Sequence, residues 1–228
     1  MEFVQSADFW IGLVKIVWIN IILSGDNAVV IALAARSLPP HQQRKAVFWG
    51  SGAAVVLRIA LTVVAAKLLE LSFLQIVGGC LLLWIGFQLL SGDDESEGES
   101  KTYCSLMAAV RTILIADLVM SLDNVIAVAA AAHGNVILLV LGLAISIPLV
   151  IFGSTLMIKL MDRFPVIIVL GAALIGWVGG ETIASDAILH DYAVAHPALH
   201  YVAAALGAAL VVAVGKFWRA KPQNESVA

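Results

Sequence analysis

The stretch ILSGDNAVVIA, residues 22–32, places Asp26 and Asn27 in the middle of a long apolar run. The run covers about residues 9–35, and a helix needs only ~20 residues to cross a bilayer. A carboxylate at this depth is unfavourable, because a charged side chain at the bilayer centre costs at least ~2.5–3.5 kcal/mol on insertion scales. The rest of the sequence should therefore supply a partner for Asp26.

The composition places nearly the whole chain in a bilayer. Hydrophobic residues make up 61% of the sequence and charged residues 13%, and the mean hydropathy is +1.00, far from the values of soluble domains. Apolar runs of this length without alternating polarity predict helices. We expect an all-α, multi-pass membrane protein with seven transmembrane helices, over about residues 9–35, 46–68, 71–90, 104–132, 135–158, 164–184 and 198–217.

The lysines and arginines predict the orientation of the chain. With seven spans, nine basic residues lie in the loops, span ends and C-terminal segment of one side, and the other side holds only Lys67. Because cytoplasmic loops carry the excess of Lys and Arg, the C-terminus is expected in the cytoplasm and the N-terminus outside. The nine residues are Arg36, Arg44, Lys45, Lys101, Lys159, Arg163, Lys216, Arg219 and Lys221.

An acidic segment of low complexity divides the chain into two related halves. The segment SGDDESEGES, residues 91–100, has nothing to bury and is expected to be a solvated cytoplasmic linker. Each half is a three-helix repeat, and an odd number of spans inverts the second repeat in the membrane, as in many secondary transporters. The predicted organisation is a first repeat over 1–90, a linker over 91–103, a second repeat over 104–184, and an outer loop, seventh helix and cytoplasmic tail over 185–228.

The repeat is clearest at the polar residues of the spans. WINIILSGDN at 18–27 aligns without gaps on IADLVMSLDN at 115–124. Inversion of one repeat brings the two Asp-Asn pairs face to face near mid-membrane. Facing carboxylates are tolerable there only when they are protonated, paired with a fixed cation, or bridged by a bound cation. The alignment pairs Ser24 with Ser121, Asp26 with Asp123, and Asn27 with Asn124.

A third acid, Asp117, lies six residues before Asp123, and its counterpart in the first half is Asn20. Together with the two Asp-Asn pairs and the hydroxyl groups of Ser24 and Ser121, it completes a ligand set made of oxygen atoms. Such a set suits a hard divalent ion, namely manganese, magnesium or calcium, better than zinc or copper. We therefore predict a divalent metal ion as the substrate, and no prosthetic group.

Several polar residues leave alternatives open. Arg58 in the second span can pair with the acids in a purely structural network, or can balance them when no cation is bound. Arg111 lies close enough to a helix end to reach the interface. Glu181 is either an outer station for a cation or proton, or a side chain that reaches interfacial water. Gly25 can loosen the first span and free backbone carbonyl groups, whereas the second half has Leu122 at that position.

The segment after the sixth span contains two pairs of residues at helical i, i+4 spacing. Asp186 and His190 form one pair, and His196 and His200 form the other. Such pairs can bind a metal on one face of a helix. The pattern is loose and the segment is aqueous, so ordinary solvated histidines are the simpler interpretation.

The segments LSGDNAVVIALAAR and SLDNVIAVAA, with the seven-span layout, resemble the TerC family of integral membrane proteins, in the wider group of LysE-type exporters. The likeness covers about residues 9–218. It implies export of manganese(II) from the bacterial cytoplasm across the inner membrane. Family members are also associated with tellurite resistance and with support of membrane or secreted proteins. The residues that match the implied metal site are Asp26, Asn27, Asp123 and Asn124, with Asp117 in the acidic position before the second motif.

The sequence thus predicts a secondary transporter that exports a divalent cation, most simply Mn²⁺, by alternating access and in exchange for protons. The alternatives are an exporter of another small solute and an assembly factor for membrane proteins. No nucleotide-binding motif and no catalytic constellation within the spans was found, so an enzyme and a nucleic-acid partner are not expected. The other expected partners are the lipid bilayer and a second copy of the chain, packed through small residues such as those of 202–215.

Overall fold

The computed structural model describes residues 7–68, 71, 73–91, 99–132 and 135–219. Every regular element in these residues is a helix, which confirms the all-α prediction. Long apolar runs form helices in a bilayer because a helix satisfies its backbone hydrogen bonds internally. In chain order the elements are α1 (Ala7–Ile22), α2 (Gly25–Ala35), α3 (Pro40–Leu68), α4 (Leu74–Ser91), α5 (Glu99–Ala132), α6 (Val136–Arg163), α7 (Val166–Ala184), η2 (Ala187–Leu189), α8 (His190–Ala195) and α9 (Ala198–Arg219).

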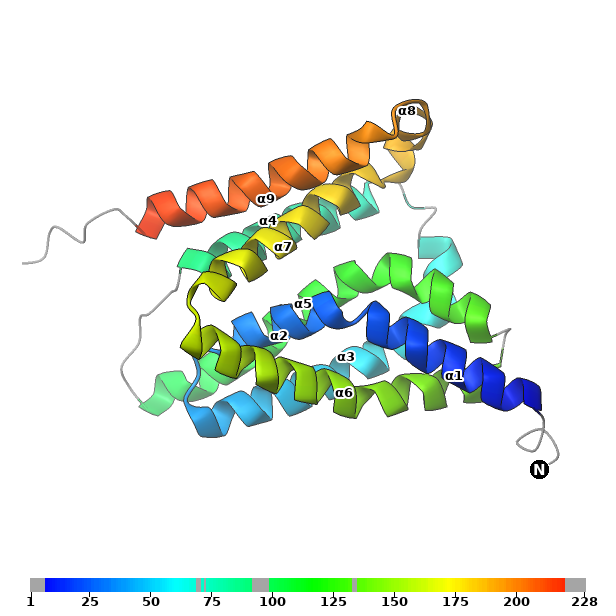
Figure 1. Ribbon diagram of the computed structural model, residues 1–228, viewed down its shortest axis with the longest axis horizontal. Helices are drawn as coiled ribbons and strands as arrows, with labels where there is room; N and C mark the ends of the chain where they lie inside the picture. Colours follow the sequence, from blue (N-terminus) through cyan, green and yellow to red (C-terminus); the bar gives the residue numbers. More distant parts are fainter. Residues whose placement is uncertain (1–6, 69–70, 72, 92–98, 133–134, 220–228) are drawn as a thin grey trace, which may run out of the picture.

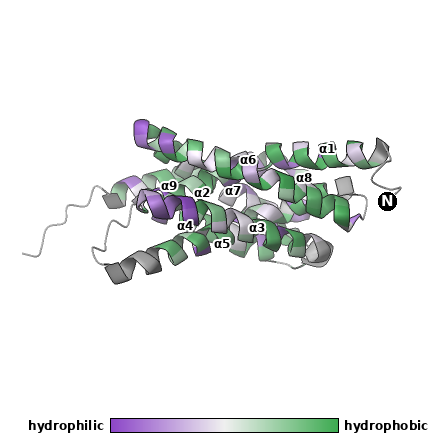
Figure 2. Ribbon diagram, turned by 90° about the horizontal axis from the view of Figure 1, so that it is seen from below, coloured by the Kyte–Doolittle hydropathy of each residue, from purple (hydrophilic) through white to green (hydrophobic). Residues whose placement is uncertain are grey.

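Five of the described helices, α3, α4, α6, α7 and α9, are each long and apolar enough to cross a membrane, and α1 with α2 forms a sixth candidate. α5 is not among these candidates, so length and composition give up to six spans in the described residues, and the expected count of seven is not confirmed. Large apolar side chains cover the outside of the helices; Trp18 is 63% and Phe152 is 70% exposed. Figure 2 shows hydrophobic residues along the helices and many hydrophilic residues toward one end. This pattern fits a molecule surrounded by lipid.

The helix expected over 9–35 is interrupted, and this expectation is corrected. α1 ends at Ile22, α2 begins at Gly25, and the two axes meet at an angle of 48°. In the second half, α5 continues through the matching positions without a break. The two copies of the motif therefore have different backbones.

The helices form two layers. Figure 1 shows α4, α7 and α9 side by side, with α1, α2, α3, α5 and α6 in a second group beneath them. In the first layer α7 contacts both α4 and α9 at glycines. A Cβ atom on Gly79 would lie 2.5 Å from the Gly179 carbonyl oxygen, and one on Gly176 would lie 2.6 Å from the Gly207 carbonyl oxygen. Backbones this close leave room for hydrogen only, as in small-residue membrane helix packing.

The second layer has a reciprocal arrangement. α3 packs along α5, and α6 packs along α1 and α2. Apolar clusters lie toward its two ends: Val47 and Ile113 belong to one, and Ile16 and Leu143 belong to the other. Buried polar side chains from α1, α3 and α5 lie in the same layer.

Candidate cation site at the broken helix

The break between α1 and α2 exposes backbone groups that a continuous helix would satisfy. The Leu23 carbonyl oxygen accepts hydrogen bonds from the side-chain amides of Asn27, at 3.4 Å, and Asn124, at 3.5 Å. The backbone N–H of Asn27 donates to the Asp26 carboxylate at 2.8 Å. These side chains replace part of the hydrogen bonding of the missing turn. The asparagines of the two motifs thus meet on one carbonyl oxygen.

A buried polar network lies next to the break and is centred on Arg58 of α3. Its guanidinium donates from Nη2 to Asp117 Oδ1 at 2.5 Å, from Nη1 to Asn20 Oδ1 at 2.9 Å, and from Nε to Ser121 Oγ at 3.0 Å. Ser24 Oγ donates to the same Asn20 oxygen at 3.3 Å. Arg58 is 4% exposed and Asp117 is 5% exposed, so the pair lies well away from the surface. A buried pair of this kind needs its extra hydrogen bonds to offset the cost of desolvation.

A small cavity of about 20 Å³ adjoins this network. Three buried oxygen atoms on its wall have no hydrogen-bond partner among the described residues: Asn27 Oδ1, Ser51 Oγ and Asp117 Oδ2. Buried polar atoms rarely remain unpaired, because each costs the desolvation of that atom. The described residues that line the cavity are Asn20, Ser24, Asn27, Ile31, Ser51, Ala54, Val55, Arg58, Asp117, Ser146 and Val150.

The cavity is lined by matching residues of the two halves. Asn20 and Asp117 occupy aligned positions of α1 and α5, and both contribute to the wall. Sequence analysis missed Ser51 of α3 and Ser146 of α6, which also line it. A signal for them exists, because each serine is followed four residues later by a valine that lines the same cavity. Serines are common in membrane helices, so this spacing is noticeable only once the cavity is known.

The predicted facing pair of Asp26 and Asp123 lies partly outside the described residues. Asp26 lies in the first turn of α2, is partly exposed and is not among the described residues that line the cavity. Asp123 belongs to α5, but its side chain lies outside what the structure describes. Within the described residues, no group of three or more Asp, Glu, His or Cys side chains is close enough to hold a metal. The acid that reaches the cavity is Asp117.

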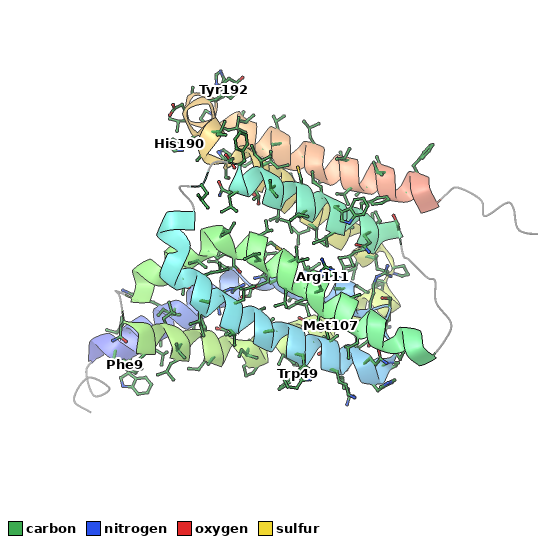
Figure 3. The ribbon with its side chains drawn as sticks, turned by 180° about the vertical axis from the view of Figure 1, so that it is seen from behind. Phe9, Trp49, Met107, Arg111, His190 and Tyr192 are labelled. Atoms are coloured by element: carbon green, nitrogen blue, oxygen red, sulfur yellow. The ribbon has the colours of Figure 1, made fainter. Side chains whose placement is uncertain are left out.

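Glu181 lies in a different place, on the exposed side of α7. It lines a hollow of about 660 Å³ together with residues of α8 and α9, among them His190 and His200. Figure 3 shows His190 and Tyr192 at the α8 end of the molecule. The hollow is separate from the cavity at Arg58, since no residue lines both. Its position fits a side chain in contact with water better than a ligand of the central site.

Asp186 is not available as a metal ligand of the outer segment. Its carboxylate is fully buried and accepts hydrogen bonds from the backbone N–H groups of Phe73, Gln75, Ile76 and Ile188 at 3.1–3.2 Å. Burial raises the pKa of the Asp186 carboxyl, but the backbone N–H donors lower it by more, so the net pKa lies below its ordinary value of 3.8. Through these hydrogen bonds, Asp186 instead links η2 to the N-terminus of α4.

Arg111, the second arginine of the spans, takes no part in the central network. Its side chain is exposed, and it is not among the described residues that line the cavity. Figure 3 shows it on α5, one turn from Met107. Its exposure fits the predicted role at the interface rather than a role in charge balance at the site.

Comparisons with known proteins place the chain in a family. Residues 5–223 match the integral membrane protein TerC family. The chain belongs to this family. A membrane protein of Bacillus subtilis (strain 168), YjbE, is 42% identical over 215 residues, which cover 94% of this chain and 98% of that protein. No solved structure matches the chain.

Two further relatives of this TerC-family chain are longer proteins of Escherichia coli (strain K12). The inner membrane protein YoaE is 28% identical over 94% of this chain and 44% of its own length. The protein YegH is 26% identical over 81% of this chain and 38% of its own length. This chain therefore spans less than half of either protein. It is an integral, multi-pass membrane protein with relatives in the bacterial inner membrane.

Proposed function

We propose that the chain is a secondary transporter that exports a divalent cation, with Mn²⁺ as the best candidate. The observation that carries the proposal is the buried cavity with three unpaired oxygen atoms, one of them a carboxylate oxygen of Asp117. Unpaired buried oxygens of this kind are explained when a cation or a water occupies the space between them. A cation is favoured because all three atoms are acceptors or, for Ser51, a hydroxyl that can act as one.

The size of the cavity supports an ion over a larger solute. A cavity needs about 10–15 Å³ to hold one water molecule on this measure. The observed volume of about 20 Å³ is enough for one water or one dehydrated ion, and too small for an amino acid. Carboxylate, amide and hydroxyl oxygens suit Mn²⁺, Mg²⁺ or Ca²⁺ better than soft metals. The same cavity therefore argues against the alternative of a small-solute exporter.

An inverted repeat is supported by how the halves pack. α3 on α5 and α6 on the α1–α2 pair are equivalent contacts when the second repeat is inverted. The aligned residues Asn20 and Asp117 lie at one cavity, and the aligned asparagines share the Leu23 carbonyl oxygen. A site on a pseudo-twofold axis can open to either side as the two repeats exchange conformations. This arrangement supports the proposal of alternating access around seven crossings, with α1–α2 as one and α5 as another.

The proposed orientation is supported by the basic residues at one end of the molecule. The ends of α2 and α6, which carry Arg36 and Arg163, lie at the same end of the molecule as the end of α9 (Figure 1). By the positive-inside rule this end faces the cytoplasm. Export of a cation then works against the membrane potential, at ~2.3 kcal/mol per charge per 100 mV, so the outward gradient of the metal, or exchange for protons, has to supply the energy. The proposed location is the inner membrane, with possible partners limited to the metal, lipid and a second copy of the chain.

An assembly factor for membrane proteins remains the second candidate function, and an enzyme is not proposed. The assembly role leaves the unpaired cavity oxygens unexplained, whereas cation transport uses them. The two candidates differ in a direct measurement, which is cation flux by the purified chain alone.

The test uses protein reconstituted into vesicles loaded with Mn²⁺, with Mg²⁺, Ca²⁺ and Zn²⁺ as competitors. We expect Mn²⁺ flux, and we expect Asp117→Asn to abolish it, because the neutral amide loses the carboxylate that faces the cavity. Asp162→Asn, which changes an exposed acid near the end of α6, is the matched control and should retain flux. Absence of flux in the unaltered protein, or full flux in Asp117→Asn, would refute the proposal.

A further inference from the structure

The two halves of the site differ most in charge at Arg58. Ser51 and Val55 of α3, and Ser146 and Val150 of α6, line the cavity at the same spacing, so we take Val55 and Val150 as equivalent positions of the two repeats. Arg58 and Gly153 each follow three residues later. One half therefore contributes a guanidinium where the other contributes no side chain at all. Near Gly153 the space is bounded by Ala28, and a Cβ atom there would make ordinary contact at 3.6 Å.

The Arg58 guanidinium occupies oxygens that the sequence assigns to the metal. It holds Asn20 from the first half, and Asp117 and Ser121 from the second, at 2.5–3.0 Å. A divalent cation that binds the same oxygens competes with the guanidinium, because both need the same lone pairs and the two positive charges repel strongly in a buried site. The arginine and the cation are therefore competitors.

The competition is incomplete in this arrangement. Asp117 gives Oδ1 to Arg58, while its Oδ2 lies on the cavity wall without a partner among the described residues. Asn27 Oδ1 and Ser51 Oγ are unpaired on the same wall. A cation can make its first contacts with these three atoms while Arg58 is in place. Full coordination then requires Arg58 to release Asp117.

We propose that Arg58 is a built-in substitute for the cation, which neutralises the emptied site and so allows the empty transporter to return. This inference rests on the proposed function and adds the mechanism of the return step. With Arg58 on Asp117, the positive and negative charges of this pair cancel. Among the described residues that line the cavity, Arg58 is the one arginine and Asp117 the one acid, so the two charges match in number.

The proposal separates two modes of transport that can be measured in the same vesicles. Net efflux requires the empty transporter to return, whereas exchange of radioactive Mn²⁺ for unlabelled Mn²⁺ requires the loaded form alone. We expect Arg58→Gln to lower net efflux by about tenfold or more, because an unpaired carboxylate in the bilayer raises the barrier to return. Exchange should persist. Arg58→Lys keeps the charge and should recover part of net efflux.

The outcomes distinguish this inference from the proposed function. Failure of the unaltered protein to perform either efflux or exchange refutes the proposed function itself. Full net efflux by Arg58→Gln refutes only the substitute-cation role, and so does equal loss of both modes in an Arg58→Gln protein that stays monodisperse with unchanged helical content. If Arg58→Gln does not insert into the membrane, the test uses Arg58→Lys. In that variant net efflux should fall more than exchange, and an equal fall of both would refute the substitute-cation role. Arg111→Gln, at an exposed arginine of α5, is the control and should change neither mode.

Discussion

The two layers of the molecule are held together in opposite ways. In the α4–α7–α9 layer, glycines bring backbones into contact, and Gly180 of α7 lies directly against the Ala203 carbonyl group of α9. In the layer of α1, α2, α3, α5 and α6, a charged pair, a broken helix and unpaired oxygens lie at the centre. Close backbone packing permits one arrangement, whereas a polar site with unpaired groups can gain by changing its arrangement. Under the proposed function, the first layer is the scaffold and the second layer is the part that binds the substrate.

A contrast of the same kind exists between the two Asp-Asn motifs. They align without gaps, yet the first lies at a helix break and the second within the continuous α5. Asn124 of the continuous helix donates to the Leu23 carbonyl oxygen at the break. The break is therefore completed by the other half, and a repeat in sequence does not require equality in conformation.

The largest effect is expected in the scaffold layer. Gly180→Ala places a Cβ atom into the Ala203 carbonyl group, which can be relieved only by separating α7 from α9. We expect a loss of about 3 kcal/mol in stability, the upper end of the usual range for overpacking. Thermal unfolding in detergent, followed by circular dichroism, measures it. Gly52→Ala is the control, since a Cβ atom on Gly52 meets no atom within 4 Å, and similar losses in both variants would contradict a special role of the α7–α9 contact.

A smaller effect is expected at the outer end of the scaffold, where Asp186 fastens η2 to α4. Asp186→Asn should lower the free energy of unfolding by about 2 kcal/mol at neutral pH, because a charged acceptor of several N–H groups is lost. The folded-state pKa of Asp186 is lowered, so its ionised form stabilises the fold above the unfolded value near 3.8, and this stability is lost as the pH falls through the folded value. The difference in unfolding free energy between the unaltered protein and Asp186→Asn should therefore become smaller as the pH falls.

Unfolding curves over a series of pH values test this dependence. The control is Asp191→Asn, which changes an exposed acid of α8. Its free energy of unfolding should equal that of the unaltered protein at every pH. A difference between Asp186→Asn and the unaltered protein that grows toward acid pH would be inconsistent with the hydrogen bonds seen at Asp186.

The sequence predicted the helical class and the membrane setting because apolar runs of this length have few other structures in lipid. Of the residues singled out because polar groups are costly in a span, Asn20, Ser24, Asn27 and Asp117 line the cavity, and Ser121 accepts a hydrogen bond from Arg58. It could not choose between the two roles of Arg58, because pairing depends on how α3 meets α5. Gly25 indicated that this span is loosened, but the sequence did not give the 48° bend or the place of Asp26 in the first turn of α2.

The smallest effect is expected at Gly25, and it tests what causes the break. A Cβ atom on Gly25 meets nothing within 4 Å, and the φ angle of Gly25 lies outside the left-handed region, so alanine fits without strain. We expect Gly25→Ala to change stability by no more than about 0.5–1 kcal/mol, in the stabilising direction, and to preserve Mn²⁺ flux in vesicles. If flux is lost, the break depends on the glycine. If flux is preserved, the hydrogen bonds of Asp26, Asn27 and Asn124 are sufficient to hold the break without the glycine. The glycine is then not a required part of the motif, in agreement with Leu122 at the aligned position of the second copy.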